Sequence, residues 1–146
     1  MDFIKKNSVD YLDFIAEKQK LIESSGFDID KNTLNPLLYD FQKDIVRWAL
    51  AKGKSAIFAD CGLGKTPMQL EWANQICNHT GGNVLILAPL AVASQTVEEG
   101  KKFNISVNIC ESQADVKDGI NITNYESCQS LRLIHLKGLY LMRAQY

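Results

Sequence analysis

The chain has 146 residues, of which 46% are hydrophobic and 23% are charged, and its net charge is −1 from 16 basic and 17 acidic residues. This is the composition of one ordinary globular domain, with no block of basic residues that would by itself indicate nucleic-acid binding and no apolar run near the ~18–20 residues of a membrane span. The four cysteines form no C-x-x-C pair, which favours a reduced, cytoplasmic protein without a zinc site: Cys61, Cys77, Cys110 and Cys128.

Residues 1–35 are predicted to form a helix followed by a connector. Apolar side chains recur at helical spacing between Val9 and Ser25, and Gly26 is a typical helix stop. We expect this helix to pack against the rest of the domain. The stretch from Phe27 to Asn35 is polar and turn-prone, which indicates a connector.

A second helix is predicted between Pro36 and Gly53. Asp40 can cap its N-terminus, and Gly53 ends it. Its apolar residues repeat at i, i+4, i+7 and i+8: Phe41, Ile45, Trp48 and Ala49. Core packing accounts for these residues but not for Gln42, which by its position alone is an ordinary surface residue.

The segment Ser55–Thr66 (SAIFADCGLGKT) predicts a strand, a tight loop and the start of a helix. Glycines let backbone N–H groups approach and wrap a triphosphate, and the following helix offers its free N-terminal amides. Lys65 would place its charge on the β- and γ-phosphates, and Thr66 would bind Mg²⁺. The pattern departs from G-x-x-x-x-G-K-[ST] only at Ala59, and a plain strand-to-turn junction is the alternative. The predicted binding residues are Asp60, Cys61, Gly62, Leu63, Gly64, Lys65 and Thr66.

Helices and strands then alternate. A helix is predicted over Lys65–His79, and its apolar face carries Met68, Trp72 and Ile76. The remaining predicted elements are a buried strand at Asn83–Ala88, a helix at Ala93–Phe103, and strands at Ser106–Cys110 and Gly119–Thr123. This alternation predicts an α/β fold with a mostly parallel sheet.

Four segments within about residues 37–126 resemble, in order, motifs of superfamily 2 (DEAD/DEAH-like) helicases of bacterial or phage type. They are LYDFQKDIVRWAL (the Q motif), GLGKT (the phosphate loop), VLILAPLAVASQTVEE (motif Ia) and INITNYE (motif Ib). The resemblance implies a RecA-like P-loop domain, incomplete here and preceded by the N-terminal helix. It also implies that ATP and Mg²⁺ are the cofactors and that Lys65 and Thr66 are catalytic.

The resemblance assigns two further roles. Gln42 would read the adenine edge, for which its amide has the required donor and acceptor. In the family, motif Ia contacts the nucleic-acid backbone, DNA rather than RNA in our reading, through side chains and helix amides of the kind that bind phosphate. The positions carried over are Pro89, Ser94, Gln95 and Thr96. For these four, a strand-to-helix turn with a helix cap is an equal alternative.

The family pattern stops after Glu126. The Asp-Glu pair that holds Mg²⁺ and activates water in the family is absent, and residues 127–146 (SCQSLRLIHLKGLYLMRAQY) contain no acidic residue. When the chain is back-translated and read displaced by one nucleotide, permitted codons give a Val-Val-Leu run followed by Asp-Glu. We hypothesise that residues 127–146 arise from a frameshift, with a generic amphipathic tail as the alternative. We expect the sheet to lack its carboxylate-bearing strand.

The sequence therefore predicts three parts: residues 1–35, residues 36–126 as the first part of an ATP-binding domain, and the atypical tail 127–146. The expected function is ATP binding within a helicase or translocase that couples ATP hydrolysis to movement on nucleic acid, with this chain inactive alone. One alternative is a P-loop nucleotide-binding module or small-molecule kinase without a nucleic-acid role. Another is a truncated product that does not fold cooperatively.

Overall fold

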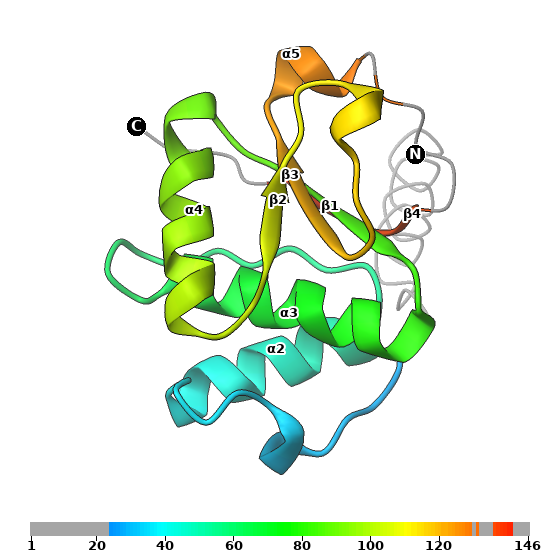
Figure 1. The fold of residues 1–146 in the computed structure, drawn as a ribbon. Coiled ribbons are helices and arrows are strands. Elements are labelled where there is room, and N and C mark those ends of the chain that lie inside the picture. Colours follow the sequence, from blue (N-terminus) through cyan, green and yellow to red (C-terminus); the bar gives the residue numbers. More distant parts are fainter. Residues whose placement is uncertain (1–23, 130, 132–135, 142–146) are drawn as a thin grey trace, which may run out of the picture.

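The computed structural model describes residues 24–129, 131 and 136–141. Within these residues the chain forms an α/β fold with one parallel sheet of four strands in the order β2-β3-β1-β4 (Figure 1). The strands are β1 (Asn83–Leu87), β2 (Val107–Ile109), β3 (Ile120–Thr123) and β4 (Leu136–Leu141). The helices are α2 (Asp40–Lys52), α3 (Lys65–Thr80), α4 (Leu90–Lys102) and the short α5 (Tyr125–Cys128), with 3₁₀ turns η1 (Lys31–Thr33) and η2 (Gln113–Asp115). The predicted α/β class and parallel sheet are confirmed.

Strand β1 lies inside the sheet because it pairs with β3 on one side and with β4 on the other. Its residues Val84 and Ile86 are fully buried in the main core, whereas Leu85 and Leu87 face a smaller cluster with Cys110 and Leu131. A parallel strand that is covered on both faces is apolar along its whole length. This explains the uninterrupted NVLIL run.

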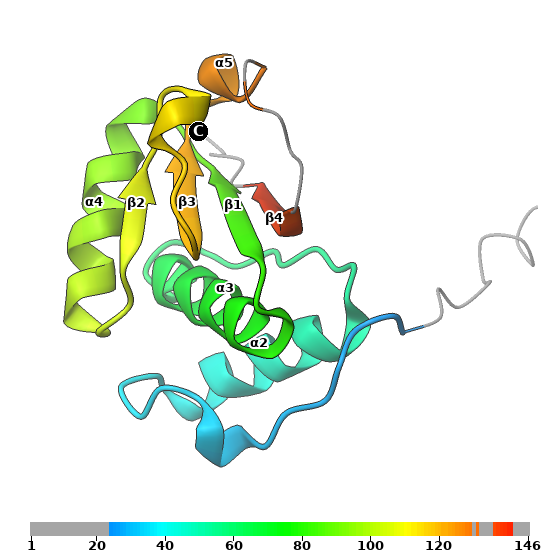
Figure 2. The ribbon, with the colours of Figure 1, turned by 45° about the vertical axis from the view of Figure 1, so that its right-hand side comes forward.

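The main core lies between the sheet and the helices. Helix α3 lies between the strands and α2, so that α2 packs against α3 on the side away from the sheet (Figures 1 and 2). The predicted apolar face of α3 is buried: Met68, Trp72 and Ile76 are 2%, 9% and 8% exposed. The same helix buries Glu71, whose Oε1 accepts the backbone N–H of Asn35 at 3.1 Å and thereby fixes the segment that leads into α2.

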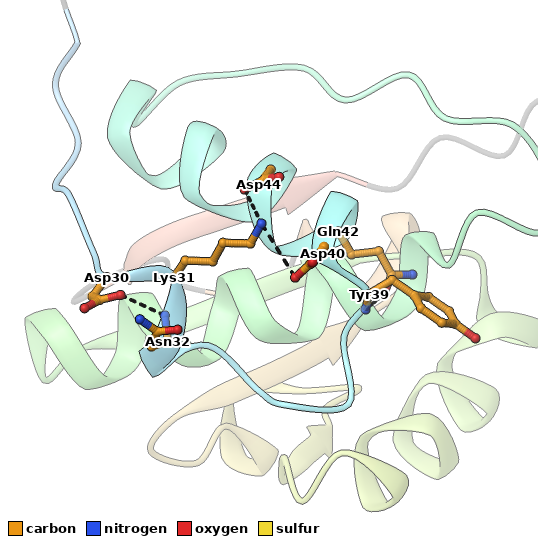
Figure 3. Close-up of polar contacts among 7 residues, drawn as sticks. All are labelled: Asp30, Lys31, Asn32, Tyr39, Asp40, Gln42 and Asp44. Carbon is orange, nitrogen blue, oxygen red and sulfur yellow. Dashed lines mark hydrogen bonds and ion pairs between the residues drawn. The ribbon is translucent and has the colours of Figure 1, made fainter.

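The start of α2 differs from the prediction. Tyr39, not Asp40, is the N-cap residue, and the Oε1 atom of Gln42 accepts the Tyr39 backbone N–H at 2.9 Å. Asp40 instead lies near Lys31 Nζ, at 3.6 Å, while Asp44 lies at 2.8 Å from the same nitrogen (Figure 3). These ion pairs are largely exposed, and such pairs contribute little to stability.

One prediction about a strand is wrong, and one strand was not predicted. The segment Ser55–Ala59 is not a strand but an irregular stretch between α2 and α3, in which the Phe58 side chain is 89% exposed. The tail contributes β4 next to β1, a strand that the sequence did not predict, and its sequence LKGLYL has no acidic residue. The helix predicted between Val9 and Ser25 lies almost entirely outside the described residues.

Candidate functional site

The predicted phosphate-binding loop is a tight turn that runs directly into α3. Gly62 and Gly64 have φ values of 82° and 74°, in the left-handed region that glycine adopts without a steric penalty. The Leu63 N–H donates to the Asp60 carbonyl at 3.4 Å, and the Met68 N–H donates to the Gly64 carbonyl at 3.3 Å as the helix begins. The loop therefore leads into the N-terminus of a 16-residue helix, and a glycine turn before a helix N-terminus is an arrangement that binds anions in other proteins.

Lys65 is the first residue of α3, and its side chain folds back over the loop. The Nζ atom donates to the backbone carbonyls of Ala59 at 2.9 Å and Asp60 at 3.0 Å. An ammonium group binds an anionic oxygen more strongly than a neutral carbonyl, so a phosphate in the loop would compete for these hydrogen bonds. Thr66 follows at the second helical position and is half-buried.

Gln42 connects the start of α2 to the loop. Its side chain is only 4% exposed, its Nε2 atom donates to the Leu63 carbonyl at 3.1 Å, and its Oε1 atom accepts from Tyr39. Figure 3 shows the Gln42 side chain beside the Tyr39 backbone, while the Tyr39 ring points away from it. A Cβ atom on Gly64 would collide with Gln42 Nε2, so glycine is needed there for space as well as for its φ value. The amide that the resemblance assigns to adenine is therefore buried and bonded within the chain.

An open cavity of about 420 Å³ adjoins the loop. Most of its walls are apolar side chains from α2, α3 and the segment between them: the lining residues are Phe41, Ile45, Phe58, Ala59, Asp60, Leu63 and Met68. Sequence reasoning placed Phe41 in the core and Phe58 in a strand, but they are 44% and 89% exposed. No sequence signal could have found this cavity, because it depends on how α2, α3 and the segment between them pack.

The four candidate nucleic-acid positions are the N-cap residue of α4 and three residues near the middle of that helix. Pro89 is the N-cap residue, and Ser94 and Gln95 are exposed. Thr96 is fully buried, and its Oγ1 atom donates to the Val92 carbonyl at 2.9 Å. The prediction that Thr96 contacts the nucleic-acid backbone is therefore wrong, because its side chain is buried in the core. Within the described part of the chain, no hydrogen bond joins these positions to the loop.

The donor set near the loop suits a phosphate better than a metal held by protein alone. In the parts that the structure describes, no three or more His, Cys, Asp and Glu side chains gather as a metal would require. Thr66 is the one predicted Mg²⁺ ligand, and it lies half-buried at the second position of α3. None of the described helices combines the length and apolarity that a membrane crossing needs.

No protein-family model matches the chain, and no curated protein matches it either.

Proposed function

We propose that this chain binds ATP with Mg²⁺ through Asp60–Thr66, as the first part of a RecA-like motor domain of a superfamily 2 helicase or translocase. One observation carries the proposal: two glycines in the left-handed region lead into the N-terminus of a 16-residue helix, with the Lys65 ammonium group folded over that turn. Each of these features favours a polyphosphate.

Four loop residues then have defined tasks. The backbone N–H groups around Gly62 and Gly64 wrap the phosphates, and Lys65 transfers its hydrogen bonds from two carbonyls to the β- and γ-phosphate oxygens. Thr66 would hold Mg²⁺ through its hydroxyl oxygen, and the ion would supply positive charge against the phosphates. Gln42 holds the loop in position through the Leu63 carbonyl.

We propose binding without efficient hydrolysis for this chain alone. Strand β4 and the rest of residues 127–146 contain no Asp or Glu, so they offer no carboxylate to hold Mg²⁺ or to activate water. Movement on nucleic acid would then belong to a longer protein. There, Pro89 and the exposed Ser94 and Gln95 would contact the phosphate backbone of the nucleic acid.

The burial of Thr96 favours a second candidate, a P-loop nucleotide-binding module or small-molecule kinase without a nucleic-acid role, because it removes one of the four expected backbone contacts. The two candidates differ in their response to DNA. A motor domain would bind single-stranded DNA with an affinity that falls steeply with salt, whereas the module would ignore it.

The test is Lys65→Ala, with Lys101→Ala as the matched control, because Lys101 is an exposed residue that pairs with Glu98 at the far end of α4. A hydrogen bond to a charged group contributes about 1.5–3 kcal/mol, so we expect at least a tenfold loss of Mg-ATP affinity by calorimetry for Lys65→Ala and no loss for the control. Unchanged affinity in Lys65→Ala would contradict the proposal.

A thermal melt addresses whether the chain folds. A ligand stabilises only a folded state that it binds, so Mg-ATP should raise the melting temperature of the native chain and of Lys101→Ala, and should raise that of Lys65→Ala by less at the same concentration. A broad, non-cooperative melt that Mg-ATP leaves unchanged would instead indicate a truncated product that does not fold.

A further inference from the structure

We infer that the nucleotide site discriminates only weakly between adenine and guanine, and that Gln42 positions the loop instead of reading the base. This inference rests on the proposed nucleotide site and defines its substrate class as purine nucleoside triphosphates. It follows from what the Gln42 amide contacts and from what lines the adjoining cavity.

The Gln42 amide is buried and held by two contacts, so its second N–H and its second oxygen lone pair do not reach a base in the adjoining cavity. Its Oε1 atom accepts from the Tyr39 N–H at 2.9 Å, and its Nε2 atom donates to the Leu63 carbonyl at 3.1 Å. The side chain is 4% exposed and is not among the residues that line the cavity. To reach a base in the cavity, the side chain would have to leave its buried position, and it would then lose the contact that caps α2 and the contact that holds the loop.

The cavity beside the loop offers a base mainly apolar contact. Its exposed walls include two aromatic rings, Phe41 and Phe58, and the Leu63 side chain. Among the lining residues, Asp60 has the one polar side chain, and because it is exposed, its hydrogen bonds to a base compete with water. The Asp60 carbonyl and the neighbouring Ala59 carbonyl already accept from Lys65.

Apolar contact and stacking accept any base, because every base has a π-face. A site that hydrogen-bonds a particular substrate group can reject an analogue without that group by about 10⁴–10⁵-fold, whereas apolar contact separates close analogues by only about 10–200-fold. Adenine and guanine have similar ring area, so we expect their triphosphates to bind alike. Pyrimidine triphosphates should bind more weakly, and inorganic tripolyphosphate should be weakest.

The first experiment measures the affinities of the 146-residue chain for ATP, GTP, CTP and tripolyphosphate by calorimetry, with Mg²⁺. We expect ATP and GTP affinities within about threefold of each other, with tripolyphosphate at least about fivefold weaker, because base stacking contributes about 1–3 kcal/mol. A preference for ATP over GTP of tenfold or more would overturn the inference and leave the proposed function intact. Failure of every probe to bind would overturn both.

The second experiment tests the positioning role with Gln42→Glu, whose carboxylate cannot donate to the Leu63 carbonyl. We expect it to weaken ATP, GTP and tripolyphosphate by the same factor, so that the ratio of ATP to GTP affinity stays constant. Gln129→Glu, the same change at an exposed position, should alter none of these affinities. A change in the ATP to GTP ratio for Gln42→Glu alone would show that Gln42 reads the base.

Gln42 also caps α2, so Gln42→Glu could unfold the protein. Phe58→Ala provides a second test of the inference that leaves Gln42 unchanged. Phe58 is 89% exposed, so its removal should leave the melt nearly unchanged. We expect Phe58→Ala to weaken ATP and GTP equally, by threefold or more, and to leave tripolyphosphate unaffected. Unchanged ATP and GTP affinity would show that the base does not use this cavity, which overturns the inference.

Discussion

The segments Ser55–Ala59 and Asn83–Leu87 look alike as sequence but differ in the structure. Each is a short apolar run that precedes a turn and a helix. Asn83–Leu87 is strand β1, with four of its five residues buried. Ser55–Ala59 forms no strand, and it exposes nearly the whole Phe58 side chain.

The difference lies in their neighbours. Strand β1 pairs with β3 along Val84–Leu87 and with β4 on its other side, so its backbone and its side chains have partners on every side. Cross-strand pairs are what stabilise a sheet, and β-propensity is largely a measure of such packing. Ser55–Ala59 has no strand partner in the described part of the chain. An apolar run is therefore necessary for a buried strand but does not by itself produce one.

The largest expected effect comes from truncating one apolar residue in each run. Ile86 is fully buried, so Ile86→Ala should reduce the free energy of unfolding by about 2–5 kcal/mol. Phe58→Ala removes an exposed ring and should change the free energy of unfolding by no more than about 0.5 kcal/mol. Urea denaturation of both variants measures the contrast. If Ile86→Ala and Phe58→Ala reduced the free energy of unfolding equally, Ser55–Ala59 would be packed as tightly as β1.

A smaller effect is expected where β4 meets β1. A Cβ atom on Gly138 would lie 3.2 Å from Ile76 Cδ1, 3.2 Å from Val84 Cγ2 and 3.3 Å from Trp72. Overpacking of this kind costs about 1–3 kcal/mol, so Gly138→Val should destabilise the fold by that amount, and Gly138→Ala by less. If urea denaturation shows no change for Gly138→Val, β4 does not occupy the place beside β1, and the two runs differ less than the structure indicates.

The smallest effect concerns the loop that follows Ser55–Ala59. Gly62 and Gly64 share positive φ values, so alanine at either position carries a backbone penalty of about 1–2 kcal/mol. Gly62 has open space around it, whereas alanine at position 64 must also displace Gln42. We expect Gly64→Ala to be the more destabilising by about 1 kcal/mol, the typical value of one hydrogen bond, in thermal or urea unfolding. The reverse order would mean that Gln42 does not hold the loop.

Much of the fold could be predicted from residue patterns. Helices α2 and α3 end at Gly53 and Gly81, and the continuous apolar run of β1 correctly indicated a strand covered on both faces. These predictions succeed because helix ends and apolar periodicity depend on neighbours close in sequence. The glycines of the loop belong to the same class, since a positive φ is a local property.

Other features were decided only when distant segments came together. The sequence determined a loop with two glycines, a lysine and a helix behind it, because those residue types fix backbone conformation and charge locally. The tertiary structure decided that Gln42 and Thr96 are buried and bonded internally, that Phe58 is exposed, and that Leu136–Leu141 joins the sheet. The physical reason is that the burial of a side chain, and the pairing of a strand, depend on residues tens of positions away in the chain, which no local pattern specifies.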